Sequence, residues 1–279
     1  ADTPPAADTG GPWHPWLHVV SAREGLPALD VAPAAAVLVS RDVDLGRSIA
    51  ALRDHLLRNQ VPVVTLVVGH WSKAAGVARD GEWGRAAVRG LGTALDALPA
   101  AVLGAVPEDL RLPLAHQFPA FRAAVAADIV ERTSKANAGY ALTTGLAESV
   151  PVLTAPLALG DMLMLTKNQL VMCYRLVLAH GRDGDPRELV GEIIGVLGSG
   201  LLFRQAARQL VGLIPVLGIV PKVAVAYAGT YAIGRSMTLW AAEGREVTGG
   251  AVRRLSKEGF AKGKGIARAL LDQARSAGA

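Results

Sequence analysis

Residues 209–234 read QLVGLIPVLGIVPKVAVAYAGTYAIG, and Lys222 is their only charged residue. Pro215, Gly218 and Pro221 interrupt the run, so each half is shorter than the roughly 20 apolar residues that a membrane-spanning helix needs. The pattern predicts a helical hairpin that bends at 214–221. The residues that we expect to face a membrane or a partner at this bend are Ile214, Pro215, Leu217, Ile219, Pro221 and Lys222.

The second arm of this hairpin carries small residues at a regular spacing. Ala224, Ala228 and Ala232 are each four positions apart, so they share one face of a helix. Such a face is a flat strip on which another helix can lie closely.

Two longer helices are predicted upstream of the hairpin. In 122–148, Asp128/Arg132 and Glu131/Lys135 stand in the favourable i,i+4 order. The helix predicted at 161–179 is apolar almost all round, so we expect it to be buried on most sides. Its polar residues Asp161, Asn168 and Arg175 recur every seventh position and form one narrow stripe, and His180-Gly181 is its predicted end, followed by a turn at Gly184-Asp185-Pro186.

A small set of polar residues is expected inside this helical bundle. These positions are Asp161, Lys167, Asn168, Gln169 and Glu192. A buried carboxylate is costly without a cationic partner, so Lys167 or Lys222 is expected to pair with Asp161 or Glu192.

The part before Phe118 has a different pattern. Apolar runs of strand length occur at 35–40, 61–68 and 101–106, and stretches with helical spacing occur at 45–56 and 82–98. The run at 61–68 is β-branched on both faces, as in a buried parallel strand. Alternating strands and helices predict a small parallel α/β domain.

The composition of the chain narrows the function classes. Hydrophobic residues make up 51%, charged residues 19%, and the mean hydropathy is +0.31, which excludes disorder over most of the chain and favours a protein near a membrane. The single cysteine, Cys173, excludes internal disulfides and a multi-thiolate zinc site, and its apolar neighbours predict a buried small hydrophobe.

The net charge of +5 comes from the C-terminal end. From Arg245 onward there are eight basic and three acidic residues, so the rest of the chain is about neutral. This tail fits either an amphipathic segment on an acidic surface or a solvated terminal helix, which Gly259, Gly263 and Gly265 are expected to weaken.

The motifs of common enzyme chemistry are absent from the sequence. It contains no phosphate-binding loop GxxxxGK[ST], no nucleophile elbow GxSxG, no HExxH and no CxxC. The glycine-rich stretch 195–200 does not follow a strand, so it predicts helix packing or a kink. We therefore predict no catalytic residue, metal or cofactor. Without an RNA-binding, zinc-finger or recognition-helix pattern, we expect no nucleic-acid partner either.

The helical region resembles the GTPase-associated family called domain of unknown function 697, which includes YcjF-like membrane proteins. The resemblance covers 131–245 and rests on the order of AGYA at 138–141, GLAE at 145–148, Pro151, Pro156, Asp161, KNQLVM at 167–172, Gly181, LIP at 213–215, Lys222 and TYAIG at 230–234. It implies a helical module that follows or binds a GTPase domain, or associates with a membrane. No catalytic residues are carried over, because none is established for this module.

The N-terminal part resembles pieces of nucleotide-switch folds. Residues 36–68 are similar to the strand–helix–strand after the second switch of Era-like GTPases, and 102–109 are similar to the last strand and base-facing loop of MinD/ParA-type ATPases. The second resemblance makes Pro107, Glu108 and Asp109 candidates for nucleotide binding. Where GTPases have Asn-Lys-x-Asp, this chain has Gly-His-Trp-Ser-Lys at 69–73, which does not support guanine recognition.

These patterns predict a mostly helical α+β protein. Its expected parts are an irregular leader at 1–33, a degenerate α/β domain without a phosphate loop at 34–117, a helical domain with a hairpin at 118–245 and a basic tail at 246–279. We expect a non-catalytic binding protein that is cytoplasmic, at or in the inner membrane, with a GTPase domain or membrane lipid as partner. An NTP-binding switch protein that lacks its phosphate loop is the alternative, and a homo-oligomeric bundle is a third.

Overall fold

The computed structural model describes residues 33–40, 46–68, 75–79, 91–147, 154–198, 219–244 and 247–277. The described chain is mostly helical with one small sheet, which confirms the predicted fold class. It divides into two compact units, 1–107 and 108–279. The sequence suggested a boundary at 117/118, whereas the structure places it at 107/108. Helix α3 (Glu108–Gln117) therefore belongs with the helical unit.

The first unit contains the sheet. Its elements are β1 (Ala36–Ser40), α1 (Gly46–Arg58), β2 (Val63–Val68), β3 (Ala75–Arg79) and α2 (Leu91–Ala105). Strand β1 pairs with β2 in parallel, with Ala36 opposite Val63, as the β-strand–helix–β-strand pattern predicted. Strand β3 pairs with β2 in the antiparallel direction, and no pattern in the sequence predicted this strand.

The core of this unit forms between the parallel strand pair and α1. Leu38, Leu56, Val61 and Val63 are buried together, and Ile49, Leu52 and Leu57 pack against them. The predicted helical spacing of the α1 leucines is therefore confirmed. The helix ends with Gln60 at a φ of 59°, where the amide of Val61 donates to Leu56 O at 3.0 Å and closes the chain back onto the strand.

The strand predicted at 101–106 is wrong. Residues 101–105 form the last part of α2, and Val106 donates its amide to Val102 O at 2.9 Å, which continues the helical bonding. A short apolar run is compatible with a buried strand and with a buried helix, and here it extends a helix whose upstream half is also apolar. The start of the helix predicted at 82–98 lies outside the described residues, and α2 is seen from Leu91.

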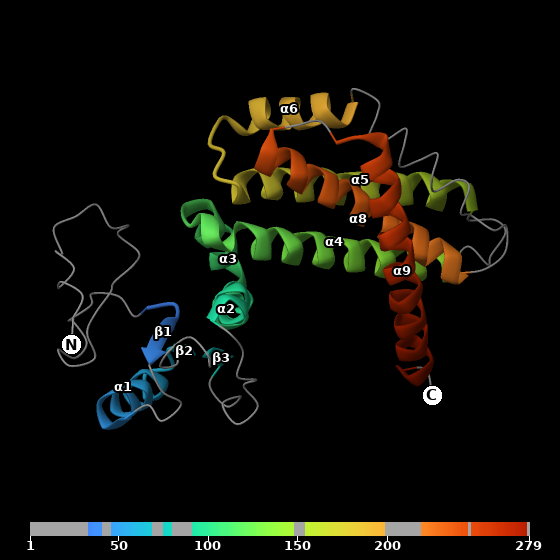
Figure 1. Ribbon diagram of the computed structural model, residues 1–279. Helices are drawn as coiled ribbons and strands as arrows, with labels where there is room; N and C mark the ends of the chain where they lie inside the picture. The colour runs from blue at the N-terminus through green and yellow to red at the C-terminus, as the bar shows by residue number, and fades with distance from the viewer. Residues whose placement is uncertain are drawn as a thin grey trace. The chain divides into compact units, whose positions relative to one another are not determined.

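The second unit is built on three long helices. Helices α4 (Pro119–Ala147), α5 (Thr154–Ala179) and α8 (Ile219–Glu243) lie side by side and contact one another in every pairing (Figure 1). Helix α3 contacts α4 and α5, and α6 (Pro186–Gly198) contacts α5. Helix α9 (Gly249–Ala277) crosses α8, and its C-terminal part runs past the other helices.

The ends of α5 and α6 follow the signals in the sequence. Helix α5 ends at Ala179, and Gly181 has a φ of 79° with its amide donating to Leu178 O at 2.9 Å. The side chain of Asp185 accepts a hydrogen bond from the amide of Arg187 at 2.7 Å and caps α6. The predicted helix end and turn are both confirmed.

Helix α9 packs on α8 through glycines. A Cβ atom at Gly259 would lie 3.1 Å from the Cα of Ala228, and a Cβ atom at Gly263 would lie 3.0 Å from the Cα of Ala224. The predicted strip of small residues on α8 is thus confirmed as a close helix contact. Gly259 and Gly263, which the sequence marked as residues that weaken a helix, also allow the close approach of α9 to α8.

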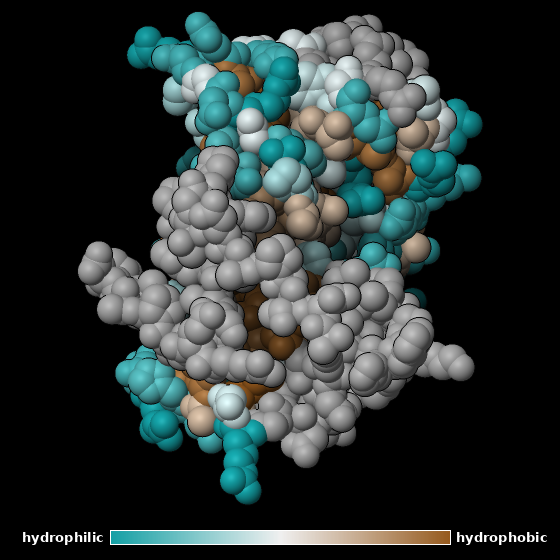
Figure 2. Space-filling model, turned by 60° about the vertical axis from the view of Figure 1, so that its left-hand side comes forward, coloured by the Kyte–Doolittle hydropathy of each residue, from teal (hydrophilic) through white to brown (hydrophobic). Residues whose placement is uncertain are grey.

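The predicted hairpin is seen in part. Its first arm, with Ile214, Pro215 and Leu217, lies outside the described residues, and its second arm is the N-terminal half of α8. On the face shown in Figure 2, hydrophilic side chains predominate among the described residues of the helical unit, and hydrophobic ones show as smaller areas between them. Much of the apolar content of the unit is inside, and α8 is buried from Tyr227 to Gly234.

Candidate functional site

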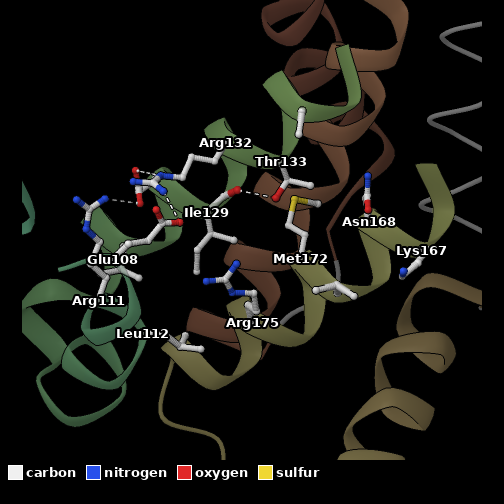
Figure 3. A pocket seen from close by; sticks show the side chains of 14 residues that line it. Glu108, Arg111, Leu112, Ile129, Arg132, Thr133, Lys167, Asn168, Met172 and Arg175 are labelled. Carbon is white, nitrogen blue, oxygen red and sulfur yellow. Dashed lines mark hydrogen bonds and ion pairs between the residues drawn. The ribbon is translucent and has the colours of Figure 1, made fainter. Parts of the chain in front are cut away.

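A pocket of about 360 Å³ lies on the helical unit between α3, α4 and α5 (Figure 3). Its wall combines charged and apolar side chains, with four basic and two acidic residues. The lining residues are Glu108, Arg111, Leu112, Val125, Asp128, Ile129, Arg132, Thr133, Ala136, Lys167, Asn168, Val171, Met172 and Arg175. The excess of two positive charges favours a ligand with negative charge.

An ion-pair cluster between α3 and α4 forms one end of the pocket. Arg132 bonds to Glu108, and its Nε donates to Asp128 Oδ1 at 2.9 Å. Arg111 Nη1 donates to Asp128 Oδ2 at 3.2 Å. The hydrogen bond to Glu108, followed by that to Asp128, raises the pKa of the Arg132 guanidinium above its usual value. Both carboxylates and both guanidinium groups are therefore already engaged with each other.

The α5 side of the pocket carries two further cations. Lys167 and Arg175 are exposed, and neither has an ion-pair partner among the residues that the structure describes. In Figure 3, Arg175 lies near the middle of the pocket, and Lys167 lies at the end away from the ion-pair cluster. Val171 stands between them on the same helix and is 48% exposed, which is high for a valine in a helical bundle.

A buried polar network holds the three long helices in register behind the pocket. Asn137 Nδ2 donates to Thr230 Oγ1 at 2.8 Å, and Asn168 Nδ2 donates to Asn137 Oδ1 at 2.7 Å. Gln169 Nε2 donates to Thr230 Oγ1 at 3.3 Å. Thr230 and Asn137 are fully buried, so these hydrogen bonds replace the hydrogen bonds to water that the two side chains lose on folding. The network fixes α5, and with it the positions of Lys167 and Arg175.

A second surface with strong charge runs along the exposed face of α9. The helix contains seven basic and two acidic residues. Arg253, Lys257, Lys264, Arg268 and Arg275 are all exposed and are spaced by four and seven residues. At 3.6 residues per turn they lie within roughly 60° of the helix circumference. We call this line of five residues the basic stripe of α9.

Most of the basic stripe is not neutralised by other residues that the structure describes. Arg275 pairs with Asp272 at 3.7 Å. In the described part of the chain, Arg253, Lys257 and Arg268 have no ion-pair partner, and Lys264 Nζ lies 4.9 Å from the ring centre of Phe260. The stripe is therefore available to a negatively charged surface.

The opposite side of α9 is tied to α8 by Tyr231. Tyr231 Oη donates to Glu258 Oε1 at 2.5 Å, and Lys262 Nζ donates to Tyr231 Oη at 3.1 Å. The hydrogen bond from Tyr231 lowers the pKa of Glu258. Burial, followed by the bond to Glu258, raises the pKa of Tyr231. These contacts and the glycine packing orient α9 so that its basic stripe faces outward.

The polar positions predicted for the bundle have different surroundings. Asn168 and Gln169 join the buried network, and Lys167 lines the pocket. The expected partners of Glu192 are wrong, because its carboxylate lies at the surface and pairs with Arg182 at 2.9 Å. The side chain of Asp161 lies outside the described residues.

The other predicted site residues do not come together. Ile219, Pro221 and Lys222 are half-buried in the first turn of α8. Pro107, Glu108 and Asp109 stand at the start of α3, and no strand precedes them because 101–105 are helical, so the resemblance to a base-facing strand end is wrong in its local structure. Glu108 instead pairs with Arg132 in the pocket.

Some residues of the site carried only a weak signal in the sequence. The seven-residue recurrence of Asn168 and Arg175 marked the α5 wall of the pocket, although we interpreted it only as a polar stripe. Nothing in the sequence paired Asn137 with Thr230, because 93 residues separate them. The basic stripe of α9 could have been found from its spacing of four and seven residues.

Cys173 is completely buried, as predicted, and burial raises the pKa of its thiol to about 12.

The described residues include no group of three or more His, Cys, Asp and Glu side chains that could hold a metal ion. No helix among them is long and apolar enough to cross a membrane. Comparisons of the chain with models of known families, with curated proteins and with solved structures find no match.

Proposed function

We propose that this protein is a non-catalytic binding protein that docks on an anionic membrane surface through the basic stripe of α9. The observation that carries the proposal is the line of five exposed cations on one face of one helix, four of them without an ion-pair partner in the described chain. The stripe runs from Arg253 to Arg275, and these 22 steps along the helix correspond to roughly 33 Å at 1.5 Å per residue. A surface that takes all five charges must be broad and negatively charged.

A bilayer fits this surface better than a nucleic acid does. Phe260 and Leu271 lie on the same arc of α9 as the cations and are half-buried. At a lipid interface the apolar side chains can enter the region between headgroups while the cations contact lipid phosphates and carboxylates. On a nucleic acid, only the cations would contribute, through the phosphate backbone.

The hairpin and the partner protein complete this proposal. The hairpin bend at Ile214–Pro221 is the proposed point of membrane insertion, in keeping with the apolar sequence around it. A GTPase domain is the proposed protein partner, on the basis of the resemblance to the GTPase-associated family. In this arrangement the helical unit is a rigid support that holds the stripe against the membrane.

Binding to vesicles tests the proposal. The full chain should sediment with vesicles of phosphatidylcholine and phosphatidylserine and remain in the supernatant with phosphatidylcholine alone. A variant with Arg253→Gln, Lys257→Gln and Lys264→Gln should lose about 3 kcal/mol of binding free energy, on the order of 100-fold in partition coefficient, at about 1 kcal/mol per basic residue.

A matched control separates the stripe from overall charge. The variant with Arg47→Gln, Arg58→Gln and Arg187→Gln removes the same number of exposed positive charges from α1 and α6. It should bind vesicles within about twofold of the wild type. Equal loss in both variants, equal binding to both kinds of vesicle, or preference for an RNA or DNA duplex over vesicles would refute a membrane role for the stripe.

A further inference from the structure

We propose that the pocket between α3, α4 and α5 binds an elongated organic dianion, with an acidic group at each end of an apolar chain. The pocket shares no residue with the basic stripe of α9. The proposal therefore stands independently of membrane docking, and either one can fail alone.

The charges of the pocket define its two acidic subsites. Among the described residues Arg175 has no ion-pair partner, and it lines the pocket beside the ion-pair cluster, in which the carboxylates of Glu108 and Asp128 already hold Arg132. A ligand carboxylate or phosphate can therefore bind Arg175 without displacing a partner from the described part of the chain. Lys167 supplies the second positive charge, beside the amide side chain of Asn168.

The spacing of the two cations sets the length of the ligand. Lys167 and Arg175 are eight residues apart on α5, which corresponds to roughly 12 Å along the helix axis. A single small anion such as inorganic phosphate cannot contact both groups when their side chains extend along the wall. Two acidic groups on one linear molecule can do so.

The wall between the cations is apolar. Val171 is 48% exposed between them and Leu112 is half-buried, whereas Met172 and Ile129 also line the pocket but are themselves buried. Covering this wall with a hydrocarbon chain removes apolar surface from water, which a fully hydrated anion does not do. A volume of about 360 Å³ is at the lower end of the range for small-molecule sites, so it suits a single slim chain.

A series of linear dicarboxylates tests the length and the charge of the ligand. Isothermal titration of the full chain with succinate, adipate, suberate and sebacate should show affinity that rises with chain length. Octanoate, which has one acidic group, and 1,10-decanediol, which has none, should bind more weakly than sebacate. No saturable binding by any dicarboxylate, or octanoate as tight as sebacate, would overturn the proposal.

Two single substitutions test the subsites. Lys167→Gln and Arg175→Gln should each weaken sebacate binding by about fivefold, the size of one charge-assisted contact in a partly open site. Arg187→Gln, an exposed cation of α6 outside the pocket, is the matched control and should leave the affinity unchanged. These surface substitutions leave the buried network intact, and circular dichroism checks the fold.

Titration with GTP and ATP tests whether the pocket is instead a nucleotide-binding site. GTP and ATP carry their negative charge at one end of the molecule, so they should bind this pocket more weakly than sebacate. Tighter binding of either nucleotide that depends on Lys167 and Arg175 would overturn the dianion assignment. Affinity for sebacate that all three variants retain would place its binding elsewhere and overturn the proposal as well.

Discussion

Replacing Gly263 by alanine tests how α9 is held on α8. A Cβ atom at Gly263 would lie 2.8 Å from the carbonyl oxygen of Ala224 and 3.0 Å from its Cα. Both are backbone atoms of a neighbouring helix, so no side chain can rotate away, and the helices must separate. Overpacking of this kind costs about 1–3 kcal/mol, while replacing a helical glycine by alanine gains about 1 kcal/mol in helix propensity.

Gly265 is the matched control for this substitution. It lies two residues further along the same helix, it is exposed, and a Cβ atom there would have no neighbour within 4 Å. Gly265→Ala should therefore stabilise the protein by about 1 kcal/mol. The propensity gain is common to both variants, so the difference between them isolates the steric cost at Gly263 and should be about 1–3 kcal/mol.

Urea denaturation followed by far-ultraviolet circular dichroism measures this difference. The expected order of midpoints is Gly265→Ala above wild type, and Gly263→Ala well below Gly265→Ala. If the two variants were equally stable, α9 would not pack on α8 through its glycines. The orientation of the basic stripe would then depend on the contacts of Tyr231 with Glu258 and Lys262 alone.

Three further substitutions or conditions test the interior of the helical unit. Thr230→Val leaves the buried side chain of Asn137 without its hydrogen-bond acceptor and should cost about 1–3 kcal/mol of unfolding free energy in the same urea assay. The surface substitution Thr143→Val is the control and should cost less than about 0.5 kcal/mol. Cys173 should not react with a thiol reagent in the native protein and should react fully in urea, as absorbance would show, because it is buried and its thiol pKa is raised to about 12. Burial, followed by the hydrogen bond to Glu131, raises the pKa of Tyr227 above its ordinary 10.0. The contribution of Tyr227 to stability is therefore present below about pH 10 and is lost as the pH rises further. Tyr227→Phe should flatten this alkaline loss of the denaturation midpoint.

Each of these three predictions has an outcome that contradicts it. Equal stability of the two threonine variants would show that the buried network contributes nothing measurable. Fast labelling of native Cys173 would place that thiol at the surface or in an opening segment. A phenylalanine variant with the same alkaline midpoint shift as the wild type would mean that other groups control stability at high pH.

Local patterns in the sequence were sufficient for the parts of the fold that depend on near neighbours. Short apolar runs rich in β-branched residues identified β1 and β2, and glycine and proline marked the end of α5 and the start of α6. The apolar run at 101–106 was misread because a strand and the end of a buried helix have the same composition over so short a length. Strand β3 reads AGVAR, which is short and has only one β-branched residue, so it shows no strand period.

The candidate site depends on contacts that a local pattern does not contain. The pocket forms because α3, α4 and α5 meet, and the sequence gives no distance between Arg132 and Glu108, which are far apart in the chain and paired in space. The spacing of Asn168 and Arg175 places them on one face of α5, but only the packing of the helices shows that α3 and α4 lie opposite that face. Similarly, the glycines of α9 have a role only because Ala224 and Ala228 lie opposite them.

The dependence of vesicle binding on salt tests the central claim most directly. Between about 0.1 M and about 1 M salt, the screening length falls from about 10 Å to about 3 Å, which suppresses attraction between exposed charges. We predict that the wild-type chain leaves phosphatidylserine-containing vesicles over this range, and that the variant lacking Arg253, Lys257 and Lys264 charges is weakly bound at both ends of it. Binding that is equally strong for both proteins and insensitive to salt would contradict a function based on the basic stripe of α9.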